Sequence, residues 1–213
     1  MKEASMSKLL YIESSPRKDR SASIEVAKSF IHTFQSSDSQ NDVETLDLWS
    51  FSLPEIDENS VSAKFKVLHG ENLSAEESKH WEAILRIVTQ FKEADSYLFS
   101  IPMWNFSIPY KLKHFIDVIT QPGLTFSFSP ESGYQGLVVG KPATVILARG
   151  SEYSSAETSA MDFQKAYIEM ILGFIGFKDI RTILVEPTVT DPETRNIVLS
   201  TARERATALA KQL

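Results

Sequence analysis

The sequence has no cysteine among its 213 residues. Disulfide bonds, thiol catalysis and thiolate metal sites are therefore excluded. Long apolar runs are also missing: the first one, Leu9 to Ile12, is too short for the core of a signal peptide, and no stretch approaches the roughly 18 residues of a membrane span. We expect a cytoplasmic protein that does not enter a membrane, and we assign no role to the polar lead-in of residues 1–5.

The sequence has fewer positively than negatively charged residues. Lysine and arginine together number 22, against 28 aspartate and glutamate residues, and the net charge is −6. Binding to nucleic acid needs clustered lysine and arginine for phosphate contacts, and no such cluster is visible. We therefore expect no nucleic-acid partner, and we interpret the anionic surface as an aid to solubility.

Several motifs of known chemistry are absent as well. The sequence contains neither G-x-G-x-x-G nor G-x-x-x-x-G-K, so neither a Rossmann dinucleotide site nor a P-loop is supported. The G-x-S-x-G elbow of hydrolases is missing too. The four histidines are scattered without a pair at metal-ligand spacing, so we expect no metal site.

What the sequence does contain is an alternation of β-prone runs with amphipathic helical patterns. Its 42% hydrophobic and 23% charged residues are ordinary globular values, and its length suits one well-cored domain, residues 6–213. Five runs are typical of strands: Lys8 to Ile12, Val43 to Leu48, Tyr97 to Ile101, Ala143 to Ala148 and Ile180 to Val185. This alternation predicts an α/β fold with a doubly wound five-stranded parallel sheet and helices on both faces.

The third of these strands leads into an unusual loop. Pro102 ends the strand because proline cannot donate to a ladder, and Met103 to Phe106 then place two aromatic rings and an amide in four residues. Ser107 and Pro109 supply a helix start with proline in the first turn. Loops at the carboxyl ends of such strands bind ligands, and flat side chains suit a flat ligand. The two aromatic rings equally suit a plug over the core, and this stretch alone leaves both interpretations open.

The loop after the first strand carries serines and basic residues. Ser21, Ala22 and Ser23 open a helix, and three basic side chains lie between residues 17 and 20. A helix N-terminus with spare N–H groups is a ready anion site, and hydroxyl groups and positive charge would strengthen it. The alternative interpretation is that Ser21 serves only as a helix N-cap.

Two further segments lie near the later strands. Leu124 to Val139 predicts a hairpin-like excursion with Phe126 and Phe128 on the same side. It is either a wall of a ligand pocket or a surface hairpin held by its own aromatic rings. Gly150 follows a central strand, where a glycine allows close backbone approach to a ligand or simply serves a turn.

Three of these segments resemble one known family. The run Pro-Met-Trp-Asn-Phe-Ser-Ile-Pro, residues 102–109, is similar to the flavin-contacting segment of the FMN-dependent NADH-azoreductase and quinone-reductase family, which has a flavodoxin-like fold. Ser15 and the Ser21-x-Ser23 pair match serines that hold the FMN phosphate in that family. Residues 148–151, Ala-Arg-Gly-Ser, stand where the family has Ser-Arg-Gly-Gly against the flavin edge.

The resemblance implies the strand order 2-1-3-4-5, bound FMN, NADH or NADPH as electron donor, and a quinone or azo compound as acceptor in a ping-pong reaction. It implies a homodimer in which Phe174 reaches over the partner's site, with Phe126 and Phe128 also lining the substrate pocket. No side chain need act as acid or base. The cofactor-binding residues that it implies are Ser15, Ser21, Ala22, Ser23, Met103, Trp104, Asn105, Phe106, Ala148, Arg149, Gly150 and Ser151.

Two rival hypotheses remain at this point. A flavodoxin-like electron carrier or regulatory module would bind FMN without turning over a substrate, and a structural domain would have lost the cofactor. A carrier needs an exposed flavin edge, whereas the excursion at Leu124 to Val139 and Phe174 would cover the flavin. The retention of three separate FMN motifs disfavours a purely structural domain.

Overall fold

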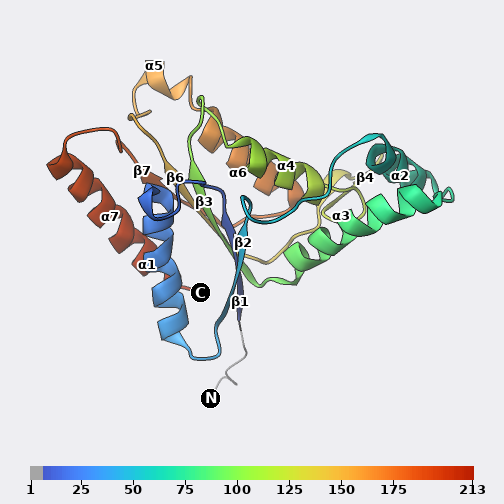
Figure 1. The fold of residues 1–213 in the computed structure, drawn as a ribbon, viewed down its shortest axis with the longest axis horizontal. Coiled ribbons are helices and arrows are strands. Elements are labelled where there is room, and N and C mark those ends of the chain that lie inside the picture. Colours follow the sequence, from blue (N-terminus) through green and yellow to red (C-terminus); the bar gives the residue numbers. More distant parts are fainter. Residues whose placement is uncertain (1–6) are drawn as a thin grey trace.

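Five parallel strands form the central sheet of the computed structural model, which describes residues 7–213 (Figure 1). The lead-in of residues 1–5, and residue 6 at the predicted domain start, lie outside the described residues. The strands of the sheet are β1 (Lys8–Glu13), β2 (Asp42–Asp47), β3 (Ser96–Pro102), β6 (Ala143–Ala148) and β7 (Ile180–Val185). The strands β4 (Phe126–Ser129) and β5 (Gly133–Gly136) form a separate antiparallel hairpin, as the sequence predicted.

The strand order in the sheet is β2-β1-β3-β6-β7. It confirms the predicted order 2-1-3-4-5, because β6 and β7 are the fourth and fifth strands of this sheet once the hairpin is set aside. The order reverses direction between β1 and β3, whose parallel register pairs Ile12 with Phe99. Loops that leave the carboxyl ends of these two strands therefore flank one crevice, where open α/β sheets bind ligands.

Helices cover both faces of the sheet (Figure 1). The helices are α1 (Ala22–Ser37), α2 (Glu58–His69), α3 (Ala75–Glu93), α4 (Tyr110–Ile119), α5 (Ala156–Ser159), α6 (Phe163–Ile175) and α7 (Pro192–Ala210), with a short 3₁₀ turn at Lys18–Arg20. One core packs α1 and α7 on one face of the sheet, and a second core packs α3, α4 and α6 on the other. None of the helices within residues 7–213 combines the length and the apolar character needed to cross a membrane.

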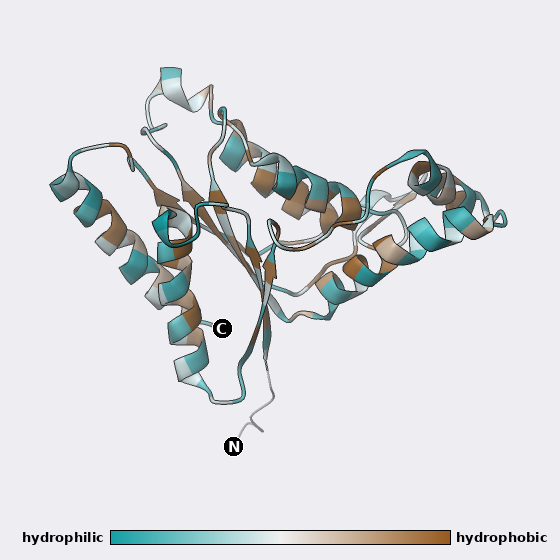
Figure 2. Cartoon of the chain, viewed as in Figure 1, coloured by the Kyte–Doolittle hydropathy of each residue, from teal (hydrophilic) through white to brown (hydrophobic). Residues whose placement is uncertain are grey.

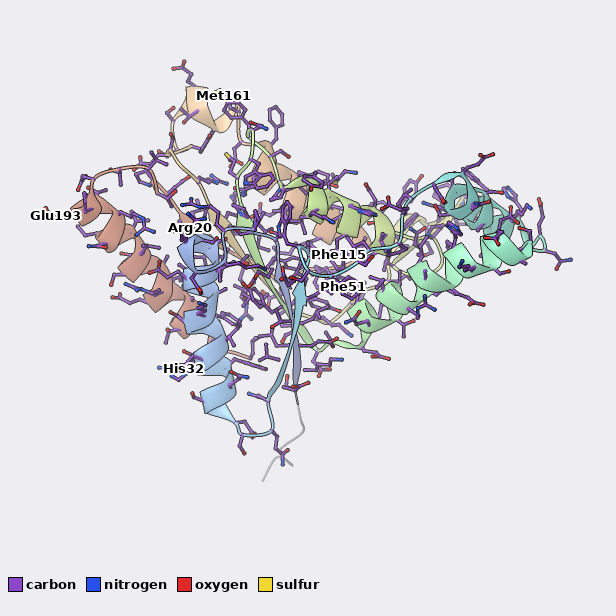
Figure 3. The ribbon with its side chains drawn as sticks, in the orientation of Figure 1. Arg20, His32, Phe51, Phe115, Met161 and Glu193 are labelled. Atoms are coloured by element: carbon purple, nitrogen blue, oxygen red, sulfur yellow. The ribbon has the colours of Figure 1, made fainter. Side chains whose placement is uncertain are left out.

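Strand alternation assigns each side chain to one of these cores. Leu9 and Tyr11 of β1 face α1, whereas Leu10 and Ile12 face the opposite core. The hydropathy colouring in Figure 2 agrees, since apolar residues concentrate on the strands and on the inner sides of the helices. In Figure 3 His32 projects outward from α1, while Phe115 lies among the packed side chains of the core.

Local capping fixes several helix boundaries. Ser74 and Glu77 form a capping box at the start of α3, and Asp57 forms another with Ser60 at the start of α2. Helix α4 begins at Tyr110, with Pro109 in the N-cap position, because Ser107 is bound into the preceding turn. Figure 1 shows α2 and α3 extending together away from the sheet.

The hairpin joins α6 through an unusually close backbone contact. A Cβ atom added at Gly136 would lie 2.3 Å from the Cα of Gly176, so no side chain fits there. Gly176 itself has φ of 122°, a conformation that other residues rarely adopt. The backbone N–H of Val138 also donates to the carbonyl of Ile175 at 2.9 Å. The hairpin and the C-terminal end of α6 are thereby held as one unit.

Candidate functional site

A buried polar network joins the carboxyl ends of β1 and β3. The backbone N–H and the hydroxyl of Ser14 both donate to the Ser100 carbonyl, at 3.2 and 2.7 Å. The Tyr11 and Ser100 hydroxyls lie 2.9 Å apart, and burial raises the pKa of Tyr11 far above its ordinary value. Buried polar groups that are paired in this way hold the two strand ends rigidly together.

The first loop brings the predicted serines together at the start of α1. Ser15, Ser21, Ala22 and Ser23 are all buried, and the Ser21 and Ser23 hydroxyls lie 3.1 Å apart. Ser21 occupies the N-cap position, but its side chain makes no cap hydrogen bond. The N-cap interpretation therefore does not explain this serine. The first turn of α1 keeps backbone N–H groups without a side-chain acceptor, which suits an anion.

Lys18 is committed to the protein's own carboxylates. Its Nζ lies 2.6 Å from Glu13 and 2.5 Å from Asp47, and its backbone has φ of 49°. Burial acts to lower the pKa of Lys18, but hydrogen bonds to Asp47 and Glu13 outweigh it, so the pKa is raised. The expectation that this lysine lends its charge to an anion at the helix start is therefore wrong, whereas Arg17 and Arg20 are exposed.

The second loop makes a tight turn with two strained residues. The backbones of Trp104 and Ser107 exchange hydrogen bonds, both at 2.9 Å. Between them, Asn105 and Phe106 have φ of 47° and 68°, the pair of positive values that a type I′ turn requires. Such values cost a residue other than glycine about 1–2 kcal/mol each. Phe106 is 47% exposed, so it does not plug the core.

Trp49 supports this turn and was missed in the sequence analysis. Its indole Nε1 donates to the Ser14 carbonyl at 2.9 Å. Its ring lies 5.7 Å from the Trp104 ring and 5.5 Å from the Tyr110 ring, between ring centres. Trp49 thus connects the first loop with the second. Its only sequence signal was a large aromatic residue just beyond the second strand.

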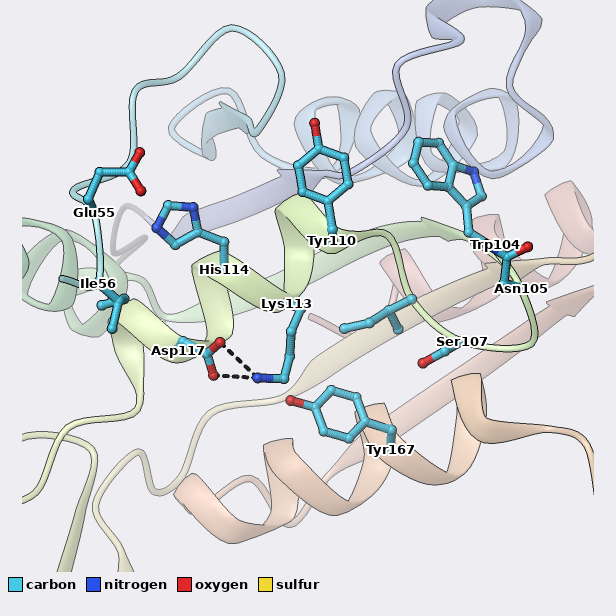
Figure 4. Close-up of a pocket in the computed structure, with 11 residues that line it drawn as sticks. Glu55, Ile56, Trp104, Asn105, Ser107, Tyr110, Lys113, His114, Asp117 and Tyr167 are labelled. Carbon is cyan, nitrogen blue, oxygen red and sulfur yellow. Dashed lines mark hydrogen bonds and ion pairs between the residues drawn. The ribbon is translucent and has the colours of Figure 1, made fainter.

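A cavity of about 790 Å³ opens beside the turn (Figure 4). Trp104, Asn105 and Ser107 line one end of it, and Tyr167 of α6 lies across from α4. Of the lining residues, the sequence predicted only Trp104 and Asn105 as site residues. Those not predicted are Glu55, Ile56, Ser107, Ile108, Tyr110, Lys113, His114, Asp117 and Tyr167. Those on α4 recur at helical spacing on one side, and this periodicity was the available signal.

The charged groups of this cavity are largely paired within the protein. Lys113 binds both carboxylate oxygens of Asp117, at 2.6 and 2.7 Å (Figure 4). His114 Nε2 lies 2.8 Å from the Pro54 carbonyl. Burial raises the pKa of Tyr167 to about 12, so its hydroxyl stays protonated at neutral pH. Apart from the exposed carboxylate of Glu55, the cavity therefore offers mainly neutral and apolar surface to a ligand.

The third loop follows β6 and turns its arginine inward. The guanidinium of Arg149 is only 2% exposed and pairs with Asp162 at 2.7 Å and with Glu186 at 3.1 Å. The Arg149 backbone N–H donates to the Val185 carbonyl at 3.0 Å, and its carbonyl accepts from the Thr188 N–H at 2.9 Å. Ala148 accepts a hydrogen bond from the Met103 N–H at 2.8 Å, which ties this loop to the second one. Gly150 and Ser151 follow, and Ser151 is exposed.

The predicted pocket aromatics form a separate cluster. Phe174 lies 4.9 Å from Phe126 and 5.6 Å from Tyr134, and Phe128 lies 4.9 Å from Tyr134, between ring centres. None of them lines the cavity beside Trp104. Figure 1 shows why, since the β4–β5 hairpin and the C-terminal end of α6 lie toward α3. Within one chain, the structure does not bring them to the crevice.

The fold and the crevice define the class of the protein. A doubly wound parallel sheet with the order 2-1-3-4-5 and loops converging at its switch point is the flavodoxin-like arrangement. A protein family described as having a flavodoxin-like fold matches residues 7–210 of this chain.

Curated and solved relatives narrow the assignment. An FMN-dependent NADH:quinone oxidoreductase of Desulfotalea psychrophila is 62% identical over 98% of each chain. An azoreductase structure from Bacillus anthracis has a TM-score of 0.89 at 27% identity, covering 98% of this chain and 100% of that one. Another B. anthracis structure, an FMN-dependent NADH-azoreductase in complex with FMN, has a TM-score of 0.85 at 31% identity, covering 96% and 100%. The chain belongs to this flavodoxin-like family of FMN-dependent NADH:quinone oxidoreductases and azoreductases, and the resemblance seen in the sequence is confirmed.

The strain in the second loop gives a testable prediction. Phe106→Gly should be more stable than Phe106→Ala by about 1 kcal/mol, because both variants lose the ring but only glycine adopts the positive φ without a Cβ penalty. Urea unfolding of the flavin-free proteins measures this difference. Equal stability of the two variants would show that the turn stores no strain at this position.

Proposed function

We propose that this chain is an FMN-dependent NAD(P)H oxidoreductase that reduces quinones and azo compounds in two half-reactions. The observation that carries the proposal is that the three loops after β1, β3 and β6 converge on one switch point of the sheet. The chain is also 62% identical to an FMN-dependent NADH:quinone oxidoreductase. The proposal assigns residues 6–213 to one FMN-binding domain. It also assigns the protein to the cytoplasm, where NADH is available as a reductant.

The residues of the crevice fit FMN. The uncapped first turn of α1, with Ser15, Ser21, Ala22 and Ser23, suits the phosphate. The strained turn suits a flat ring, because its positive φ values hold backbone polar groups and Trp104 at the crevice. We assign the ring contacts to Met103, Trp104, Asn105, Phe106, Ala148, Arg149, Gly150 and Ser151, with Arg149 contributing by holding the base of the third loop in place.

When bound, FMN would supply the hydride-transfer chemistry between the nicotinamide donor and the quinone or azo acceptor. The chain's residues bind and orient, and none is assigned as an acid or a base. The cavity beside Trp104 favours turnover of a substrate over the electron-carrier hypothesis, since a carrier needs a docking surface rather than a pocket.

The visible spectrum of the FMN-loaded protein tests this function. We expect anaerobic NADH or NADPH to bleach the flavin absorbance and a quinone such as menadione to restore it. Flavin that neither NADH nor NADPH bleaches would favour the carrier or sensor hypothesis. Failure to bind FMN would remove the cofactor assignment altogether.

The phosphate assignment predicts a selective loss of FMN affinity. Ser23→Ala should weaken FMN binding by about 1–3 kcal/mol, the range for a lost hydrogen bond to a charged group. Ser29→Ala, on the same helix but beyond its first turns, should bind FMN as the wild type does. Titration of the apoprotein with FMN, followed by flavin fluorescence, measures both. If the two variants bind equally well, Ser23 has no role in holding the phosphate.

We further propose a homodimer in which the partner completes each crevice. Phe106, Tyr110, Phe163 and Met170 are large apolar side chains exposed along the second loop, α4 and α6, which lie side by side on one face (Figure 1). Several large apolar side chains exposed on one face are typical of an interface. A two-fold partner would also supply the Phe174 cluster, which its own chain holds away from the crevice.

Sedimentation velocity tests the dimer with a matched pair of variants. Met170→Glu should shift the protein toward monomer, because it places a charge in the apolar face of α6. Ile197→Glu, equally exposed but on α7 across the sheet, should leave the dimer intact. A monomeric wild type, or a dimer that withstands Met170→Glu but not Ile197→Glu, would show that the subunits do not meet at this face.

A further inference from the structure

We propose that Gln164 is a positioning residue for FMN. Its side chain joins Arg149 to Ile101 through two buried hydrogen bonds, here called the lock, and these bonds help to set the spacing between the second and third loops. The inference rests on the proposed function, since these two loops are assigned to the flavin ring. No substrate or cofactor contact is assigned to Gln164 itself. Its role is exerted through the ends of β3 and β6.

A single buried amide joins these two strand ends. Gln164 is 0% exposed, and its Nε2 donates to the Ile101 carbonyl at 3.2 Å. Its Oε1 accepts a hydrogen bond from Arg149 Nε at 3.0 Å. Ile101 lies two residues before Met103, and Arg149 directly precedes Gly150. The amide thus contacts the base of both loops.

Backbone bonds hold the third loop to β7 and to the segment after it, but backbone bonds between the second and third loops stop at the end of the β3–β6 ladder. The β3–β6 ladder ends where Pro102 pairs with Ala148, and the Met103 N–H makes one last bond to the Ala148 carbonyl. Beyond that bond, within residues 7–213, the Met103–Ser107 and Arg149–Ser151 segments share no backbone hydrogen bond. The side-chain link through Gln164 therefore adds a direct connection between the bases of the two loops.

Arg149 is itself held from several sides. Asp162, which also caps α6 by accepting from the Lys165 N–H, and Glu186, which follows β7, pair with its guanidinium. The N–H and hydroxyl of Thr188 both donate to the Arg149 carbonyl, at 2.9 and 2.8 Å. A buried arginine with two carboxylates and an amide in fixed positions has little freedom to move. Gln164 transmits that fixed position to the end of β3.

The identity of residue 164 supports this role. Gln164, Ile168 and Leu172 follow each other at intervals of four on the buried side of α6. An amide on an otherwise apolar helix side is unfavourable unless both of its polar ends are bonded. Packing alone would be served by an apolar side chain at this position. The two hydrogen bonds to the loop bases account for the glutamine.

The test compares FMN affinity with stability in the full-length protein. Gln164→Met keeps the approximate volume but can neither donate to Ile101 nor accept from Arg149. We expect its FMN dissociation constant to rise about tenfold and the visible circular dichroism of its bound flavin to change. Ile168→Ala, one turn further along the same buried side, removes core packing without touching the lock. We expect it to lower the melting temperature and leave the FMN dissociation constant unchanged.

A second variant keeps the test decisive if Gln164→Met fails to fold. Gln164→Glu retains an acceptor for Arg149 but cannot, as a carboxylate, donate to the Ile101 carbonyl, so it too should weaken FMN binding. The proposal is wrong if Gln164→Met or Gln164→Glu binds FMN as the wild type does, or if Ile168→Ala weakens binding by the same factor. A wild type that binds no FMN would instead overturn the proposed function, so the two failures are distinguishable.

Discussion

The parallel pairing of β1 with β3 is the constraint on which the rest of the site depends. Because these strands are neighbours and their helices leave on opposite faces, their carboxyl ends open a crevice between diverging loops. Ser14, Ser100 and Tyr11 lock those ends together beneath the crevice. The first loop with its serines, the turn at Asn105 and Phe106, and the Trp49 contact all lie beyond these strand ends. The sheet therefore sets the distances between them.

Charge is used in this site mainly to hold the protein together. Lys18 is bound by Glu13 and Asp47, Arg149 by Asp162 and Glu186, and Lys113 by Asp117. For Arg149, whose guanidinium is buried, this pairing offsets the cost of burying an ion and fixes the third loop, whereas the Lys18 and Lys113 pairs are partly exposed. A ligand in the crevice then meets backbone groups, hydroxyls and aromatic rings. This selection suits a flavin, whose ring is flat and largely neutral and whose single phosphate can be met by a helix start.

Local patterns in the sequence were sufficient to predict the strands and the aromatic loop at residues 103–106, and the family resemblance was sufficient to predict the strand order. Contacts between distant segments could not be predicted, because no local pattern records them. Trp49, for example, reaches the second loop only because β2 pairs beside β1. The direction of a side chain was equally invisible, so Arg149 was expected at the flavin edge although its guanidinium points inward. The resemblance placed Phe174 over the partner's site, and its separation from the crevice of its own chain leaves that prediction open to test.

Helix α6 carries a different task at each end. Its N-terminal turn holds Asp162 and Gln164 at the bases of the loops of its own crevice, and its C-terminal turn carries Phe174 and the hairpin fixed by the contact of Gly136 with Gly176. In the proposed dimer those ends serve different subunits' crevices. In that dimer, helix α6 would connect two crevices as one rigid element, so a shift of its N-terminal turn in one subunit would also move the Phe174 cluster in the other.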